Sequence, residues 1–262
     1  MTRLGLFYLM DDFAKSPFFV FFISLVVLWL SVRLGASLRN RKPVEENARK
    51  DLDLIVPATL TLLGLVIGFS FSMAINRYDQ RKAYEEAEAN AIGTEYLRAD
   101  LLPPNNAERV RLLLRNYLDQ RILFYQTRDH SALRQIDVDT ARLQTGLWSA
   151  VHNPAEQPTP LLALAISGMN DVLNSQGFTQ AAWWNRIPIA AWLLMAAIGM
   201  CSNLLVGYGA RRAKMGPVNT LVLPIVLSVA FFLIADIDSP RMGVIRVVPQ
   251  NLRSLAESLS RQ

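Results

Sequence analysis

The sequence predicts an all-α, polytopic membrane protein with four transmembrane helices and a helical domain outside the membrane, between the second and third spans. Two observations lead to this fold class. Of the 262 residues, 52% are hydrophobic, more than is usual for a soluble domain, and they gather in four long uncharged stretches. The polar block between the second and third stretches has helical spacing throughout, and no segment alternates convincingly with a period of two.

Each uncharged stretch is close to the length that crosses a membrane. The stretches hold 17, 23, 24 and 21 residues, at positions 16–32, 54–76, 187–210 and 215–235. About 20 apolar residues cross a hydrocarbon core of roughly 30 Å. We therefore expect spans at 17–35, 54–76, 187–208 and 216–235. A cleaved signal peptide is disfavoured for the first stretch, because no small-residue cleavage site precedes the charged segment 39–42.

The spans divide the chain into a first helix pair, a helical domain, a second helix pair and a C-terminal tail, at residues 1–76, 77–186, 187–238 and 239–262. Within the domain, the segment 78–102 is rich in Ala, Glu, Leu and Arg, and no Pro or Gly pair separates it from the second span. One long helix should therefore leave the membrane and project into water, until Pro103 and Pro104 end it.

Three further helices are expected in the domain, at about 106–129, 131–151 and 161–175. Their apolar residues recur every three or four positions, as in Leu114, Leu118 and Phe124 of the first, which marks amphipathic helices packed on a common core. The proline-rich segment 153–160 reads as a loop between the last two.

Several classes of chemistry lack a sequence signal. The single cysteine, Cys201, lies inside an apolar stretch, and His130 and His152 have no acid or cysteine nearby at ligand spacing, so no metal site is predicted. The net charge of +5 is spread over loops, without a basic run interleaved with aromatic residues, and nucleic-acid binding is not expected. No nucleophile–base set or phosphate loop is present, so we predict neither an enzyme nor a cofactor.

Charge gives a prediction for orientation. With four spans, both termini and the helical domain lie on one side of the membrane, and the two short loops lie on the other. Lys and Arg near the spans are balanced between the sides, but the loop after the first span, 33–50, is the more basic flank of that span. Because the first helix usually has most influence, the short loops are expected in the cytoplasm and the helical domain outside.

The second span carries two stripes. Gly64, Gly68 and Ser72 repeat every four residues, a small-residue pattern that lets another helix approach closely. The adjacent stripe holds Leu63, Ile67 and Phe71. One interpretation is that both stripes are helix–helix contacts. The other is that one packs against a neighbouring subunit while the apolar stripe lines a constriction, where an apolar neck gates by dewetting.

Polar groups in the other spans have structural interpretations first. Asn203 in the third span is expected to bond a neighbouring helix, as buried amides do in membranes. The fourth span ends on two acids, Asp236 and Asp238, where charge is costly unless it is paired. The second span ends on the same side at Arg77. We expect Arg77 to pair with one of the acids, with Arg241 available to complete the network, although solvated helix-end charges are the alternative.

Two segments together resemble the bestrophin-like domain family of bacterial membrane proteins. They are GFSFSMAINRYDQRKAYEEAEANAIGTEYLRADLLP (68–103) and IADIDSPRMGVIRVVPQNL (234–252). The likeness covers about residues 50–252. That family is more remotely similar to true bestrophins, which are pentameric anion channels with an apolar neck on the second transmembrane helix and a helical domain beyond it.

The resemblance implies a homo-oligomer, a pentamer by analogy, embedded in the lipid bilayer of the bacterial inner membrane. It implies passage of chloride or another small anion, and places the neck on Leu63, Ile67 and Phe71. The chain departs from true bestrophins in two respects. No acidic run resembles their calcium clasp, and their helical domain is cytoplasmic, opposite to the orientation that the charges predict.

Two functions are therefore open. The first is an oligomeric ion channel, for anions, with the second span lining the pore. The second is a non-conducting membrane scaffold or envelope sensor that binds a partner through its helical domain. Cyclic symmetry around the second span would favour the channel, and a monomer or dimer would favour the scaffold.

Overall fold

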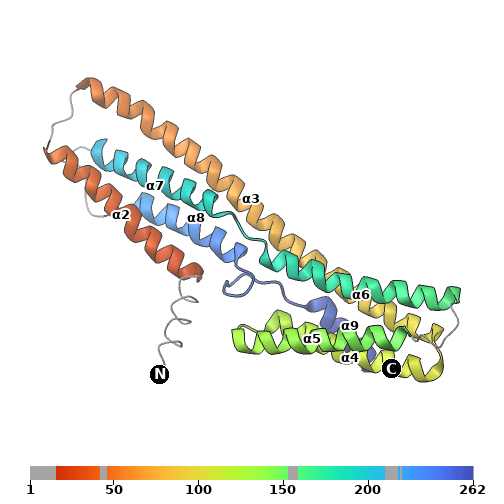
Figure 1. Ribbon diagram of the computed structural model, residues 1–262. Helices are drawn as coiled ribbons and strands as arrows, with labels where there is room; N and C mark the ends of the chain where they lie inside the picture. The colour runs from red at the N-terminus through yellow and green to blue at the C-terminus, as the bar shows by residue number, and fades with distance from the viewer. Residues whose placement is uncertain (1–15, 42–45, 153–158, 210–217, 219, 262) are drawn as a thin grey trace, which may run out of the picture. The chain divides into compact units, whose positions relative to one another are not determined.

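The computed structural model describes residues 16–41, 46–152, 159–209, 218 and 220–261, and every regular element in these residues is a helix (Figure 1). In chain order they are α2 (Pro17–Arg41), α3 (Glu46–Arg98), the 3-10 turn η1 (Ala99–Leu101), α4 (Pro104–Gln126), α5 (His130–Val151), α6 (Pro160–Trp184), α7 (Ile189–Gly209), α8 (Val222–Asp238) and α9 (Gln250–Leu259). The all-α fold class is confirmed.

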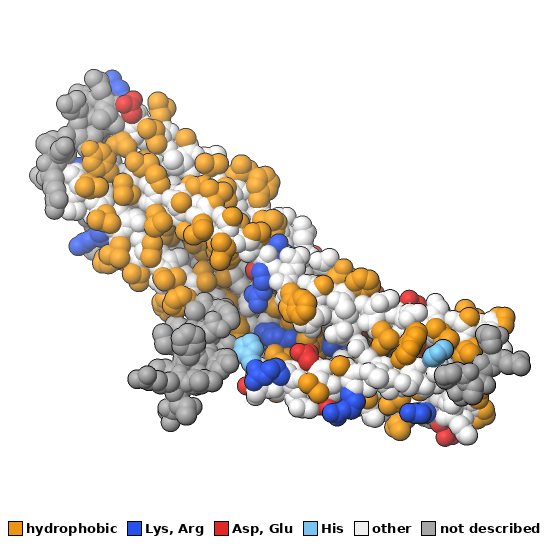
Figure 2. Space-filling model, viewed as in Figure 1, with side chains coloured by type: hydrophobic (Ala, Val, Ile, Leu, Met, Phe, Trp, Pro, Cys, Tyr) orange, Lys and Arg blue, Asp and Glu red, His pale blue; other side chains and the backbone are white. Residues whose placement is uncertain are grey.

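The helices form two compact units. The membrane unit comprises the described parts of Met1–Asn76 and Arg186–Arg246, and the helical unit comprises those of Arg77–Asn185 and Val247–Gln262. Figure 2 shows hydrophobic side chains crowded over the membrane unit, whereas charged side chains are mixed among them over the helical unit. Helix α3 contributes its first part to one unit and its second part to the other.

Three helical segments in the described residues are long and apolar enough to cross a bilayer: Pro17–Arg39, Lys50–Leu101 and Pro160–Gly209. Helix α8 is apolar too, but its 17 residues are fewer than the roughly 20 that cross a hydrocarbon core. Its described part begins at Val222 rather than at the predicted 216, and residues 216 and 217 lie outside the described residues. The fourth span therefore stays a prediction.

Helix α3 is much longer than a membrane is thick. Its 53 residues extend about 80 Å, against roughly 30 Å for a hydrocarbon core. Only the uncharged part, 54–76, suits the membrane, and the charged part from Arg77 onward belongs to the helical unit. Pro57 lies inside the helix, near the start of the uncharged part. The prediction of one uninterrupted helix leaving the second span agrees with these bounds.

In the membrane unit, α2 packs on α7 and on α8. The α2–α7 contact is built on glycine: a Cβ at Gly207 would overlap the carbonyl oxygen of Val32, and one at Gly35 would overlap that of Leu204. Small residues let two backbones approach closely where no hydrophobic force drives helices together. The two helices therefore meet backbone to backbone at this crossing.

In the helical unit, one apolar core joins α3, α4, α5, α6 and α9. Phe124 is buried at its centre, with its ring 4.9 Å from that of Trp183 and 5.6 Å from that of Tyr125. The helix starts follow local chemistry. Pro104 occupies the first turn of α4, and the carboxylate of Asp129 accepts a hydrogen bond from the amide of Ala132 at 2.7 Å to cap α5.

Two features differ from the sequence prediction. Helix α6 continues to Trp184 instead of ending near 175, because Gly177 lies on an open face and residues 178–184 contain no Pro or Gly to end the helix. The predicted C-terminal tail contains a further helix, α9, whose Leu252 and Leu259 are buried in the core. The sequence carries a signal for α9 that the prediction of a tail missed, because the residues on its core side recur at helical spacing: Leu252, Leu255, Ala256 and Leu259.

Candidate functional site

The membrane part of α3 is apolar and largely uncovered by its own chain. Leu54, Leu65 and Phe69 are 74%, 55% and 63% exposed. A thin buried stripe runs along the same segment through Leu63, Ser70 and Ala74. In a bilayer, the exposed surface must be covered by lipid, by other helices or by the contents of a pore, because the single chain does not cover it.

The three neck candidates do not share one environment. Leu63 is fully buried within its own chain, Ile67 is half-buried, and Phe71 is exposed at 36%. Of the three, Phe71 therefore has the largest surface available to a lumen in the single chain. On an α-helix, residues four apart in sequence are offset by about 40° around the helix axis. Leu63 and Phe71, eight residues apart, are therefore separated by about 80° around α3.

The small-residue stripe of α3 has no close neighbour among the described residues. Gly64, Gly68 and Ser72 are exposed, and no atom outside the local helix lies within 4 Å of a Cβ built on either glycine. A close helix partner for this stripe is therefore not found in the described part of the chain. Its role in packing stays a prediction.

Asn203 is buried between the helices of the membrane unit, but its amide bonds its own helix. The Nδ2 group donates to the carbonyl oxygen of Gly199 at 2.8 Å, one turn earlier on α7. The Nδ2 group therefore bonds its own helix and does not make the expected bond to a neighbouring helix. A side-chain amide can satisfy itself locally at i−4, and Gly199 leaves room for it to do so.

Asp236, the first of the two acids, fixes the backbone that follows the C-terminal end of α8. Its carboxylate oxygens accept hydrogen bonds from the amides of Val244 at 2.7 Å and Ile245 at 2.9 Å. Gly243 is required in the turn, because a Cβ there would overlap the carbonyl oxygen of Asp236. Asp236 is 1% exposed, so these bonds replace the water that it loses on burial.

Asp238 holds the entrance of α7 in the same way. Its carboxylate accepts a hydrogen bond from the amide of Ile187 at 3.2 Å, two residues before α7 begins. The guanidinium of Arg186 donates to its main-chain carbonyl at 3.2 Å. The acids thus tie the end of α8 to the start of α7 and to the chain that follows α8. Arg77 belongs to the helical unit, so its pairing with them, and the part of Arg241, stay predictions.

In the helical unit, α3 presents charged side chains that match the ends of two other helices. Arg81 is buried and donates to the carbonyl oxygens of Ala182 at 3.2 Å and Asn185 at 3.3 Å, at the C-terminal end of α6. One turn further, the carboxylate of Glu85 accepts the amide of Leu252 at 3.0 Å, at the N-terminal end of α9. A cation at a helix C-terminus and an anion at an N-terminus both satisfy orphan backbone groups and oppose the helix dipole.

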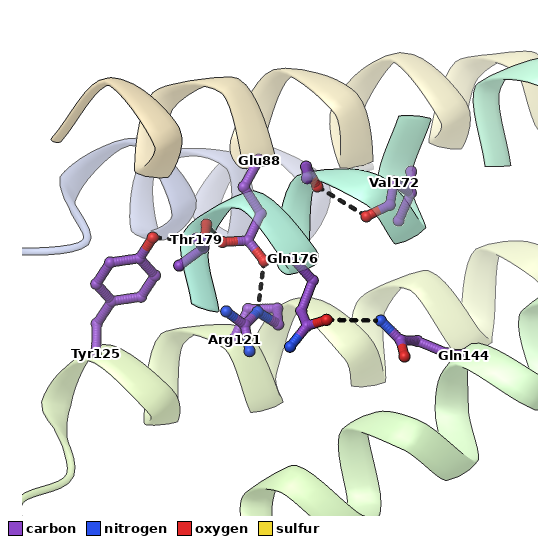
Figure 3. A network of polar contacts seen from close by, with 8 residues as sticks. Glu88, Arg121, Tyr125, Gln144, Val172, Gln176 and Thr179 are labelled. Atoms are coloured by element: carbon purple, nitrogen blue, oxygen red, sulfur yellow. Dashed lines mark hydrogen bonds and ion pairs between the residues drawn. The ribbon is translucent and has the colours of Figure 1, made fainter. Parts of the chain in front are cut away.

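Glu88 is the centre of a buried network (Figure 3). The guanidinium of Arg121 on α4 forms an ion pair with one carboxylate oxygen, and both side chains are fully buried. The hydroxyls of Thr179 and Tyr125 donate to the other oxygen at 3.2 and 3.4 Å. Arg121 also lies 4.4 Å above the ring of Phe124. Burial, followed by the charge of Glu88, raises the pKa of Tyr125, so that its hydroxyl stays a donor.

Glu95 lies two turns beyond Glu88, with both oxygens buried and with no hydrogen-bond partner among the described residues. It packs against the backbone of Gly168 on α6. Burial raises the pKa of Glu95 from its ordinary 4.5 to about 8, opposed by Arg98 and reinforced by Asp171. At neutral pH this carboxyl is therefore largely protonated, which relieves the cost of burying a charge.

These buried charges were not predicted as a site, although the sequence carries a signal for them. Arg81, Glu85, Glu88 and Glu95 recur at helical spacing along one face of α3, and Arg121 falls in the apolar stripe of α4. A charge within an apolar stripe indicates a buried counter-charge. Within the described residues, no group of three His, Cys, Asp or Glu side chains is arranged to hold a metal ion.

These features define a polytopic helical membrane protein. Several helices are long enough to span a bilayer, small residues let two of them pack closely, and the longest helix continues into the helical unit. The model of the bestrophin-like domain matches residues 18–252, about nine-tenths of the sequence. The chain belongs to the bestrophin-like domain family. A comparison with curated proteins finds no match.

Solved structures of a bacterial bestrophin homologue from Klebsiella pneumoniae are similar to the chain over nearly its whole length. One has a TM-score of 0.63 and covers 93% of this chain and 96% of its own, at 12% identity. A variant with a single substitution has a TM-score of 0.62, covering 94% and 98%, also at 12% identity. At this identity the likeness shows the fold.

Proposed function

We propose that the chain is one subunit of an oligomeric ion channel of the bacterial inner membrane, which passes chloride or another small anion and whose pore is lined by α3. The observation that carries this proposal is the membrane part of α3. It is apolar along 54–76, it is mostly exposed in the single chain, and Gly64 and Gly68 face open space.

The packing of the membrane unit supports the idea that α3 is covered by other subunits of the oligomer. Helices α2, α7 and α8 bury residues against one another, with Leu28, Met195 and Phe231 at 4% exposure or less. Helix α3 buries only a narrow stripe, so the three-helix cluster is the self-sufficient part of the unit. Copies arranged around an axis would bring α3 helices together and cover their small-residue stripe.

The chemistry of α3 suits a gate. Phe71 offers an aromatic ring at the exposed face, near the end of the uncharged part of the helix. A ring of such side chains narrows a pore and expels water from it, which stops ions without any charged barrier. The anion preference is taken from the family likeness.

Anion flux from proteoliposomes tests this function. The purified protein, reconstituted in lipid vesicles, should release chloride down a gradient at a rate proportional to the protein content. Cation gradients should give much less flux. If no gradient of chloride, bromide, nitrate, sodium or potassium produces flux above empty vesicles, the protein is a non-conducting scaffold or sensor, the second candidate.

Membrane orientation is a separate part of the proposal. The basic loop after the first span favours short loops in the cytoplasm and the helical unit outside. A cysteine introduced at Asp137, an exposed position of α5, should react with an impermeant maleimide in intact spheroplasts, in a background where Cys201 is replaced by serine. Reaction only after lysis would place the helical unit in the cytoplasm.

A further inference from the structure

The α2–α7 contact is tight at one end only. At the crossing, Gly35 and Gly207 bring the two backbones together, so that no side chain fits between them. Two turns along α7, at Gly199, the contact is made through a side chain instead: a Cβ there would lie 3.3 Å from a methyl group of Leu28. The space between the helices thus widens from the glycine crossing toward the start of α7.

This widening leaves an open wedge of about 280 Å³, with Phe231 of α8 at its base. Both walls are single helical stripes, one from α2 and one from α7. The lining residues are Val20, Ile23, Ser24, Val27 and Leu28 on α2, and Ile189, Trp192, Leu193, Ala196 and Met200 on α7. At its mouth, Ile189 and Leu193 are 78% and 66% exposed.

The lining limits what can fill the wedge. Its only aliphatic hydroxyl, that of Ser24, donates to the carbonyl oxygen of Phe21 at 3.0 Å within its own helix. Water needs two or more polar partners to occupy a cavity, and this wedge does not provide them. The occupant must therefore be hydrocarbon.

The shape of the wedge suits a thin, flexible occupant. From Ile189 to Met200 the groove runs about 16 Å along α7, with one helix on each side and Phe231 beneath. A hydrocarbon chain can lie along such a groove, whereas a helix about 10 Å in diameter reaches into it only with single side chains. Helices α2 and α7 lie in segments that suit a bilayer, where lipid is the hydrocarbon in excess; a helix of a neighbouring copy would leave the wild type without bound lipid in the experiment below.

We propose that the wedge between α2 and α7 is a binding site for one acyl chain of a membrane phospholipid. The chain enters between Val20 and Ile189, and the Leu28–Gly199 contact closes the far end. Bound there, the acyl chain buries the exposed surfaces of Ile23 and Leu193 and fills the space where the two helices diverge from the glycine crossing. The site differs from ordinary lipid contact because a wedge holds a chain on two walls and a base.

Native mass spectrometry of the purified, fully assembled protein tests the site. After extensive washing in mild detergent, the wild type should retain about one phospholipid per subunit. Ala196→Phe fills the wedge from the α7 wall and should lose that lipid. Ala197→Phe adds the same ring on the neighbouring exposed position, outside the lining, and should retain the lipid.

Thermal unfolding separates loss of lipid from loss of structure. After delipidation, palmitoyl-oleoyl phosphatidylglycerol should raise the Tm of the wild type and of Ala197→Phe. Ala196→Phe should start at a higher Tm, because its ring fills the wedge, and should not respond to the lipid. Equal lipid retention in all three proteins would overturn the proposal, as would a wild type that neither retains lipid nor responds to it.

Discussion

Replacing Arg121 with methionine removes one partner of the fully buried ion pair in the helical unit. Methionine keeps an unbranched apolar stem against Phe124 but leaves the carboxylate of Glu88 with only the hydroxyls of Thr179 and Tyr125. Both partners are 0% exposed, so water does not replace the lost bond. Removing one partner of such a pair costs about 3–5 kcal/mol.

For a unit of this size, a loss of about 3–5 kcal/mol corresponds to a drop in Tm of about 10–20 °C. Tryptophan fluorescence reports this change, because the ring of Trp183 contacts Phe124 and Tyr125. Adding Glu88→Gln to the variant removes the stranded charge and should restore at least half of the loss. That recovery separates an uncompensated charge from lost packing.

The matched control is Arg142→Met on α5. Arg142 pairs with Asp139 at 3.2 Å, but its side chain is 76% exposed, so its loss should change stability by less than about 1 kcal/mol. If Arg121→Met lowers the Tm no more than Arg142→Met does, the buried pair does not stabilise the helical unit in the way that its geometry implies.

Three further predictions concern single side chains. Glu95→Gln should become more stable than the wild type as pH rises, because the folded pKa of Glu95, about 8, exceeds its ordinary 4.5. The wild type loses stability between pH 4.5 and 8, where folding opposes ionisation of Glu95, and the difference is constant above that range. Melting curves at a series of pH values test this, with Glu86→Gln as the exposed control, and identical pH profiles for the two variants would contradict it. Gly207→Ala should lower the Tm by several degrees through its clash with α2, whereas Gly177→Ala, with open space around it, should leave the Tm unchanged or slightly raised. Asp236→Asn should cost about 1–3 kcal/mol in denaturant unfolding, since one of its two amide partners then faces an NH₂ group; a loss below 0.5 kcal/mol would contradict the capping role.

The helices were predictable where a single physical pattern decides them. Uncharged runs of membrane length give α2, α7 and the first part of α3, and Pro103 with Pro104 marks the start of α4. Helix α9 was missed although its sequence carries a signal, since Leu252, Leu255 and Leu259 lie on one helical face. Ten residues are too few for a stable helix alone, and Glu85 and the core hold this one in place.

The candidate site was predictable only in part. Asp236 and Asp238 stand out in the sequence because they follow an apolar run, but their backbone partners lie in loops that no pattern identifies. Leu63, Ile67 and Phe71 share a stripe by spacing, yet the neighbouring helices bury the first and leave the last exposed. Which face of a helix is covered depends on tertiary packing, and in an oligomer it depends on other copies as well.

Phe71 provides the most direct test of the claim that α3 lines a pore. Chloride efflux from proteoliposomes is compared for the wild type, Phe71→Ala and Phe69→Ala at equal protein content. Phe69 is 63% exposed but lies about 200° around the helix from Phe71, so it is the matched control. Widening the neck should raise the efflux rate of Phe71→Ala several-fold and leave Phe69→Ala close to the wild type. Equal rates in all three proteins would contradict a pore lined at Phe71.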